Sequence, residues 1–305
     1  DGTVCLCRIG SSERSGNIAS KNACGQLTNT YDESFMLEID QIAKTFHANT
    51  PNEVRALQGV DLKIENGSFV IVIGTNGSGK STLLNAVAGS FLVDTGQLRL
   101  KGQDITRWPE HRRAKFIGRV FQNPFTGTAP SMTIAENLAL AAKRGRTRGL
   151  GWAFGSSSKT DLYERVRAMG LGLENRLNNA MGSLSGGQRQ SLTLLMAGLI
   201  MPDLLLLDEH TAALDPKSAD QVIRLTEDVI RRDKLTTMMV THSMHQAAHL
   251  GDRLIMMVRG KVLHDFQGAE KKRLSPQDLL DRFEDVRRSE QLDETVAAML
   301  QRQYV

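Results

Sequence analysis

The chain contains 305 residues, of which 40% are hydrophobic and 24% charged, and its 38 Lys+Arg against 34 Asp+Glu give a formal net charge of +4. This is the composition of an ordinary globular protein with one large domain or two small ones. The sequence has no run of about 18 uncharged apolar residues, so it predicts no membrane-spanning helix. The small positive excess is a weak argument for a nucleic-acid ligand, and we expect none.

Residues 1–35 differ from the rest of the chain, being rich in Ser, Gly, Asn and Thr and holding all three cysteines, Cys5, Cys7 and Cys24. Such a segment has too few apolar side chains to offset its ordering entropy, and it lacks the pattern of a secretory signal. It is either a disordered native tail or a translated upstream segment. Strand-like alternation starting at Met36 favours the second interpretation. The cysteine-free remainder indicates a reducing compartment.

Continuous apolar runs predict three strands that are buried on both faces, namely residues 69–73, 204–207 and 238–240. Shorter alternating strands are predicted at 37–46 and 54–64. Helical patterns separate these runs, which predicts an α/β fold with a parallel sheet at its centre.

Residues 123 to about 185 show helical periodicity at 134–142 and 162–169 without a buried strand, which predicts a helical lobe inserted between two central strands. Another helix is predicted after Ser275, which serves as its cap with Pro276 in the first turn. Leu279, Phe283 and Val286 lie along one face of that helix.

A glycine-rich segment follows the first buried run and fits the pattern G-x-x-x-x-G-K-[ST], directly before a helical pattern at 82–88. In this context backbone N–H groups and the helix N-terminus point at phosphate oxygens. Lys80 supplies a positive charge to the β and γ phosphates, and Ser81 offers a hydroxyl to Mg²⁺. The candidate nucleotide-binding residues are Gly74, Thr75, Asn76, Gly77, Ser78, Gly79, Lys80, Ser81 and Thr82.

Polar residues end the other two buried runs. Asp208 and Glu209 follow residues 204–207, and His242 follows 238–240. Ligands of parallel sheets gather at the carboxyl ends of strands, so we expect Asp208 to hold Mg²⁺, Glu209 to polarise the attacking water and His242 to contact the γ phosphate. A second anion site is predicted at Ser185, where Leu-Ser-Gly-Gly-Gln-Arg precedes an apolar helix reaching Ile200.

These motifs, together with Ala-Leu-Asp-Pro at 213–216, occur in the order and spacing of ATP-binding cassette (ABC) ATPases, and the resemblance covers about residues 36–265. The resemblance implies a P-loop NTPase core with an antiparallel β subdomain and an inserted α-helical signature subdomain at about 123–190. Residues 266–305 would form a C-terminal helical extension. The implied cofactors are ATP and Mg²⁺.

The resemblance also implies roles for single residues. Gln122 matches the glutamine that senses Mg²⁺ and the attacking water, and Phe46 matches the aromatic residue that stacks on adenine. Asp215 matches the aspartate that reaches across the dimer interface. The loop of Ser185, Gly187 and Gln188 matches the one that contacts the γ phosphate bound by the partner subunit, so catalysis would require a second cassette.

One residue departs from the family pattern. The usual sequence is Asp-Glu-Pro-Thr, and His210 takes the place of its proline. It is either a neutral substitution in the turn or a residue that tunes Glu209 or the interface.

A single cassette with a short helical lobe favours transport over the ABC ATPases of translation and DNA repair. The implied partners are a second ATPase subunit, transmembrane permease subunits and an extracytoplasmic solute-binding protein. The chain would lie at the cytoplasmic face of the inner membrane. Phe121, Phe125 and the helical lobe would form the groove for a permease coupling helix. The basic run 143–148 is either a solvated loop or a contact for anionic headgroups.

The segments 207–217 and 274–280 resemble a bacterial importer group with branched-chain-type permeases, often assigned to tryptophan or tyrosine transport. The predicted cargo is therefore an amino-acid-like solute. The alternative is a cassette of the lipoprotein-release, macrolide-efflux or cell-division type, which resembles this chain around the P-loop but lacks the extended C-terminal helices.

Overall fold

The structure is a computed structural model that describes residues 34–145, 156–286 and 288. The expectations for residues 1–33, for 146–148 of the basic run and for residues 289–305 lie outside the described residues.

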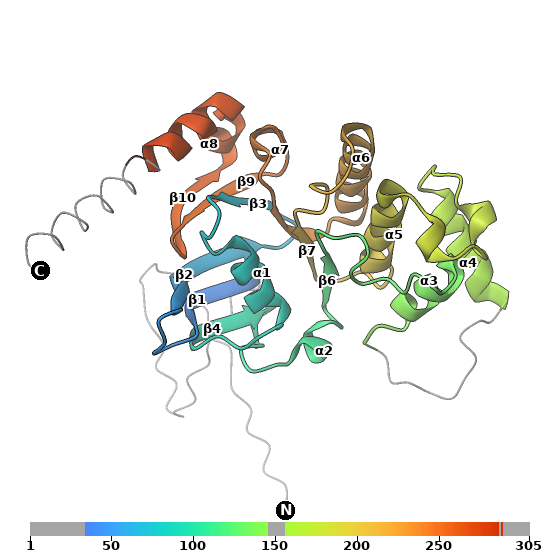
Figure 1. Ribbon diagram of the computed structural model, residues 1–305, viewed down its shortest axis with the longest axis horizontal. Helices are drawn as coiled ribbons and strands as arrows, with labels where there is room; N and C mark the ends of the chain where they lie inside the picture. The colour runs from blue at the N-terminus through green and yellow to red at the C-terminus, as the bar shows by residue number, and fades with distance from the viewer. Residues whose placement is uncertain (1–33, 146–155, 287, 289–305) are drawn as a thin grey trace, which may run out of the picture. The chain divides into compact units, whose positions relative to one another are not determined.

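A six-stranded sheet forms the centre of the fold, with the strand order β10-β9-β3-β8-β7-β6 (Figure 1). Its strands are β3 (Phe69–Gly74), β6 (Ile117–Val120), β7 (Leu204–Asp208), β8 (Thr236–Val240), β9 (Arg253–Val258) and β10 (Lys261–Gln267). All neighbours pair in parallel except β10, which is antiparallel to β9. The predicted parallel sheet is confirmed, and the three predicted apolar runs are the adjacent strands β3, β8 and β7.

The apolar runs are continuous because both faces of this sheet are covered. Val70 and Val72 of β3 belong to a core cluster with helix α1 (Lys80–Ala88), whereas Ile71 and Ile73 belong to a second cluster on the opposite face. The second cluster includes side chains of helices α5 (Gly186–Gly198), α6 (Pro216–Asp233) and α7 (Met244–His249). Alternate residues of one strand therefore enter different cores.

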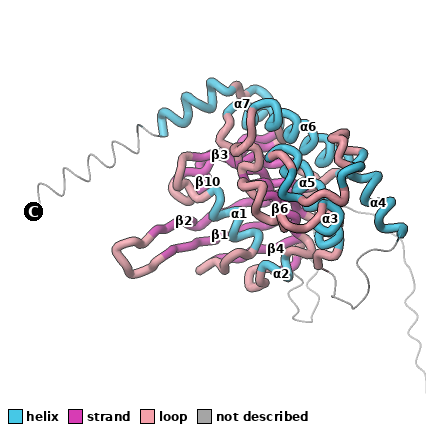
Figure 2. Tube along the Cα trace, turned by 45° about the vertical axis from the view of Figure 1, so that its right-hand side comes forward, coloured by secondary structure: helices cyan, strands magenta, loops and turns pink. Residues whose placement is uncertain are grey.

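An antiparallel sheet with the order β2-β1-β4-β5 packs on the other side of α1 (Figure 2). Its strands are β1 (Phe35–Phe46), β2 (Val54–Glu65), β4 (Thr95–Leu100) and β5 (Gln103–Asp104). The short helix α2 (Glu110–Arg113) follows it. The two predicted alternating strands are β1 and β2, whose inward residues join the α1 cluster.

The helical lobe has its own core, built from helices α3 (Ile134–Ala142) and α4 (Ser156–Arg167), two short 3₁₀ turns at Glu174–Arg176 and Met181–Ser183, and α5 from Leu192 onward. Thr133 caps α3 through a capping box with Glu136. The first predicted lobe helix has the observed bounds of α3. The second was predicted at 162–169 but begins six residues earlier, at Ser156, and ends at Arg167.

The described part of the chain closes with α8 (Gly268–Arg273) and a helix at 276–286. As predicted, Ser275 caps this last helix, since its hydroxyl oxygen accepts a hydrogen bond from the Asp278 N–H at 3.2 Å. Leu279 is fully buried in the core beside the parallel sheet, and Phe283 packs against the same core. Strand β10 crosses the predicted boundary between 265 and 266, so the division into 36–265 and 266–305 stays a prediction.

Candidate nucleotide site

The glycine-rich loop joins β3 to α1 and has no space for a side chain at Gly74 or Gly79. A Cβ atom at Gly74 would lie 2.4 Å from the Met257 carbonyl oxygen, and one at Gly79 would lie 2.5 Å from the Ala56 carbonyl oxygen. Gly77 and Gly79 have φ angles of 77° and 98°, which disfavour other residues. Packing therefore requires glycine at Gly74 and Gly79, and the backbone conformation favours it at Gly77 and Gly79.

The ammonium group of Lys80 lies across this loop, donating hydrogen bonds to the carbonyl oxygens of Gly74 at 2.9 Å and Thr75 at 3.0 Å. Burial lowers the pKa of Lys80, while the charges of Glu209 and Asp208 oppose that shift. A buried cation with only carbonyl partners can exchange them for phosphate oxygens at little cost.

The remaining loop residues also suit an anionic ligand. The Ser78 side chain is 1% exposed, and its hydroxyl has no hydrogen-bond partner among the described residues. Asn76 and Gly77 are exposed, and Thr82 lies in the first turn of α1. The residues from Gly74 to Ser78 line a cavity of about 640 Å³ together with His242. An orphaned hydroxyl, exposed backbone and Lys80 fit a polyphosphate ligand.

The carboxyl end of β7 supplies hard oxygen donors beside this loop. Ser81 donates a hydrogen bond from its hydroxyl to Asp208 at 3.4 Å, and the second carboxylate oxygen of Asp208 lies 3.5 Å from a guanidinium nitrogen of Arg119. A hydroxyl and a carboxylate are the ligand types that Mg²⁺ takes beside substrate phosphates and water. Ser81 and Asp208 therefore fit the predicted metal site.

Three predicted catalytic residues meet at one carboxylate. His242 Nε2 lies 2.5 Å from Glu209 Oε1, and the Gln122 side-chain amide donates to Glu209 Oε2 at 3.3 Å. The backbone of Glu209 has a φ of 44°, which is strained for this residue type, and its N–H donates to the Val240 carbonyl oxygen at 3.0 Å. The structure thus brings residues from the ends of β6, β7 and β8 to a carboxylate that can act as a base.

The Ser185 loop begins α5 with a capping box. Ser185 accepts a hydrogen bond from the Gln188 N–H at 3.2 Å, and the Gln188 side chain accepts from the Ser185 N–H at 3.3 Å. A Cβ atom at Gly187 would lie 2.7 Å from Ser218 Cβ, which places this loop against the start of α6. None of the three loop residues is among those that line the cavity at the glycine-rich loop.

Asp215 caps α6 through a hydrogen bond from the Ser218 N–H at 3.0 Å, and hydrogen bonds from Ser218 lower the pKa of Asp215. Like the Ser185 loop, Asp215 is not among the residues that line the cavity.

Phe46 ends β1 and packs edge-to-face against Phe91, with ring centroids 5.2 Å apart. The Lys44 ammonium lies 5.6 Å and 5.5 Å from the centroids of the two rings and pairs with Asp94 at 2.7 Å. Phe46 is therefore held by neighbours that the sequence did not reveal, and it is not among the residues that line the cavity at the glycine-rich loop.

His210 is a buried residue at 1% exposure, and its Nε2 lies 3.1 Å from the Thr226 hydroxyl of α6. That hydroxyl donates its own hydrogen to the Val222 carbonyl oxygen at 2.8 Å, so it must accept from Nε2–H. His210 Nδ1 has no partner among the described residues. Burial lowers the pKa of His210 to about 4, so the side chain is neutral in the folded protein.

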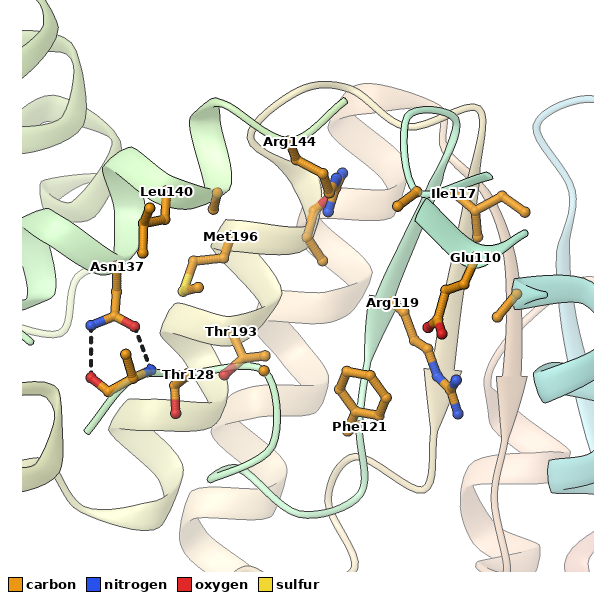
Figure 3. A pocket seen from close by; sticks show the side chains of 16 residues that line it. Glu110, Ile117, Arg119, Phe121, Thr128, Asn137, Leu140, Arg144, Thr193 and Met196 are labelled. Atoms are coloured by element: carbon orange, nitrogen blue, oxygen red, sulfur yellow. Dashed lines mark hydrogen bonds between the residues drawn. The ribbon is translucent and has the colours of Figure 1, made fainter. Parts of the chain in front are cut away.

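A second cavity of about 530 Å³ lies between the central sheet and the helical lobe (Figure 3). Glu110, Arg119 and Phe121 form one wall, and Asn137 and Leu140 stand on the opposite wall.

Phe121 lines this second cavity as expected, but Phe125 is not among the lining residues. Its ring is 58% exposed and instead covers Arg189, whose guanidinium carbon is 4.0 Å from the ring centroid. The expectation that Phe125 contributes to the permease groove stays a prediction.

Arg119 is the site residue that sequence reasoning missed. It occupies a four-residue strand and contacts Asp208 across 89 positions of sequence, so only its charge within an apolar context could have drawn attention. Its neighbour Asn85, on α1, was missed for the same reason.

A glycine-rich phosphate loop after β3, a carboxylate pair at the end of β7 in the same sheet and a second serine-glycine loop on a helical lobe together define an ABC ATPase. Residues 57–212 match the family model for the ABC transporter, and the chain belongs to that family. It is an ATP hydrolase whose activity is coupled to transport. None of the helices in the described ranges is long and apolar enough to cross a membrane.

Among known proteins, the chain is 42% identical to the "Tyrosine transport ATP-binding protein" of Clostridioides difficile over 251 residues, which is 82% of this chain and 99% of that protein. It is 33% identical to the "Lipoprotein-releasing system ATP-binding protein LolD" of Ruegeria pomeroyi over 230 residues, covering 74% of this chain and 96% of that protein. A solved structure of the ATP-binding cassette MJ0796 bound to ADP and Pi, described as dimeric, aligns with a TM-score of 0.66 at 27% identity over 76% of this chain and 98% of that one.

Proposed function

We propose that the chain energises import of an amino-acid-like solute, as one of two identical cassettes bound to separate permease subunits at the cytoplasmic face of the inner membrane. An extracytoplasmic solute-binding protein would deliver the solute. The observation that carries this proposal is the 42% identity to a tyrosine transport ATP-binding protein along 99% of its length. A relative of that coverage supports the same kind of transporter and an aromatic amino acid as the first candidate solute.

In this proposal ATP is bound by the glycine-rich loop, with Lys80 exchanging its two carbonyl partners for phosphate oxygens. Mg²⁺, held by Ser81 and Asp208 with Gln122 nearby, would neutralise charge that develops on the transferring phosphoryl group. Phe46 would stack on adenine. Catalysis would be positional and electrostatic, because phosphoryl transfer needs little covalent chemistry from the protein.

Glu209 would orient the attacking water. His242 and Gln122 each hold one of its two carboxylate oxygens, so the base has a fixed orientation before any ligand enters. His242, which is half exposed and lines the loop cavity, would also reach the γ phosphate.

Completion of the site would require a second chain. Ser185, Gly187, Gln188 and Asp215 do not line the cavity at their own glycine-rich loop, although the family resemblance expects these residues at the γ phosphate and the interface. A head-to-tail pair would bring each Ser185 loop to the partner's nucleotide. Closure of the pair would then be transmitted through the Gln122 segment to the permease, seated in the cavity of Figure 3.

The experiment that tests this proposal is purification of the tagged chain from native membranes, followed by identification of the copurifying proteins. We expect a permease with a branched-chain-type fold, and we expect tyrosine or tryptophan to stimulate ATP hydrolysis when the complex is reconstituted with its binding protein. Recovery of ribosomes or DNA in place of a permease would refute the transport assignment. Stimulation of ATP hydrolysis only by other solutes would refute the assignment of an aromatic amino acid as the cargo.

A lipoprotein-release function is the second candidate, and the 33% identity to a LolD protein over 96% of its length favours it. The helix at 276–286, whose Leu279 is built into the core, argues for the importer group, since the resemblance places extended C-terminal helices there. Copurification of a lipoprotein-binding permease would establish this alternative.

A further inference from the structure

Arg119 is a single side chain that contacts three parts of the molecule. It comes from β6, and its guanidinium carbon lies 4.4 Å from the centroid of the Phe121 ring (Figure 3). Phe121 stands in the wall of the second cavity described above, between the central sheet and the helical lobe, which we call the groove cavity. Its terminal nitrogens donate to Asn85 within α1 at 2.6 Å and to Ser90 beyond the C-terminal end of α1 at 3.1 Å. The same guanidinium is 3.5 Å from Asp208.

The pair of Arg119 and Asp208 is partly buried, with side-chain exposures of 13% and 14%. A carboxylate at the end of a buried strand needs a countercharge when no other cation is present, and Arg119 supplies one. A divalent cation at Ser81 and Asp208 would compete with Arg119 for this carboxylate, since both cations interact with the same oxygens. Arg119 therefore lowers the cation affinity of the site while it stays in this position.

The position of Arg119 depends in turn on the groove wall. The stacking contact with Phe121 and the bond to Asn85 fix the guanidinium, and its Nε atom is buried without a partner among the described residues. A guanidinium with one unsatisfied nitrogen has a reason to shift when a neighbour changes. A segment that seats against Phe121 would move Arg119 relative to Asp208.

We propose that Arg119 is a positioning residue that couples the wall of the groove cavity to the metal site, weakening cation binding at Asp208 until its guanidinium is displaced. This inference rests on the proposed function, in which the groove receives the permease and Asp208 holds Mg²⁺. The Arg119 side chain would then be the physical link between the groove cavity and the metal site.

The test uses binding rather than turnover. In the full chain carrying Glu209→Gln, calorimetry gives the ATP affinity with excess Mg²⁺ and again with EDTA, and their ratio reports the cation's contribution. We expect Arg119→Met to raise this ratio roughly tenfold, because it removes one positive charge beside a half-buried divalent site. Arg119→Lys, which keeps the charge, should stay near the unsubstituted ratio. An unchanged or lowered ratio in Arg119→Met overturns the proposal.

Arg253→Met is the matched control, because Arg253 is also 13% exposed and paired with an aspartate, Asp265, but lies on β9 away from both sites. The affinity ratio of Arg253→Met should equal that of the unsubstituted protein. If the ratio rises as much as in Arg119→Met, the rise is a general effect of losing an ion pair, and the proposal is overturned. Thermal melting of each variant confirms that it is folded.

The coupling itself is tested by Phe121→Ala, which removes the stacking contact without touching Asp208. It should shift the ratio in the same direction as Arg119→Met, and it should have no further effect in the Arg119→Met background. If Phe121→Ala shifts the affinity ratio equally in the Arg119→Met background, Phe121 acts without Arg119, through the adjacent Gln122. This result overturns the coupling role of Arg119. Failure of the unsubstituted chain to bind ATP would instead refute the proposed function.

Discussion

Acidification should destabilise the protein through His210, whose neutral ring is fully buried against Thr226. The pKa falls from the ordinary 6.5 to about 4 in the folded state. The cause is burial, and the unprotonated Nδ1 also has no acceptor among the described residues to receive a new proton. Between these two pH values the unfolded chain binds a proton that the folded chain refuses, so stability is complete above about pH 6.5 and falls as the pH decreases.

The magnitude follows from the difference of about 2.5 pKa units, at about 1.4 kcal/mol for each unit. We expect a loss of about 2 kcal/mol in the free energy of unfolding by pH 5 and about 3 kcal/mol below pH 4. Urea denaturation of nucleotide-free protein at pH 7.5, 6 and 5 measures this loss.

The control for this experiment is His210→Gln, which retains an N–H donor for Thr226 and does not titrate. The wild type should lose about 2 kcal/mol more than this variant between pH 7.5 and pH 5. Parallel pH dependences would refute the reasoning. In wild-type protein the NMR signal of the His210 ring should not titrate above pH 5, and a midpoint near pH 6.5 would refute it independently.

Three further substitutions test the nucleotide site. Glu209→Gln should retain ATP affinity and lower the rate of hydrolysis by roughly 100-fold or more. It should also leave an ATP-bound dimer that size-exclusion chromatography detects. Hydrolysis at the wild-type rate would contradict the role assigned to Glu209. Lys80→Ala should weaken equilibrium ATP binding by roughly ten- to a hundredfold together with turnover, whereas exposed Lys261→Ala serves as control and should change neither. Phe46→Ala should weaken ATP binding about tenfold through loss of stacking, and Phe46→Tyr should restore it; equal affinities of the two variants would exclude stacking on this ring.

The sequence predicts the centre of the fold well because β3, β7 and β8 are covered on both faces, which requires uninterrupted apolar residues. Strand β6 escaped prediction, since it has only four residues and includes Gly118 and Arg119. Gly118 is needed there because a Cβ atom would lie 2.8 Å from the Ala197 carbonyl oxygen of α5. Such a constraint arises from packing between distant segments and leaves no local pattern.

The candidate site also has a part that the sequence predicts and a part that depends on tertiary packing. The phosphate loop is contiguous, so its motif identifies it directly, and the strand-end rule places Glu209 and His242 at one edge of the sheet. Their contact at 2.5 Å, the burial of His210 and the link from Arg119 to Asp208 are tertiary. Sequence spacing cannot express them, because each joins side chains whose directions depend on the packed core.

The close packing of α5 on α6 has a consequence for cooperativity. Gly186 lies against Leu214, and Gly187 lies against Ser218, with no space for even a methyl group at Gly187. The Ser185 loop and the Asp215 cap therefore form one rigid block within each chain. A dimer built from such blocks would close both nucleotide sites in concert, so its ATP-binding curve should be sigmoidal, and one Gly187→Ala subunit in a mixed dimer should impair both sites.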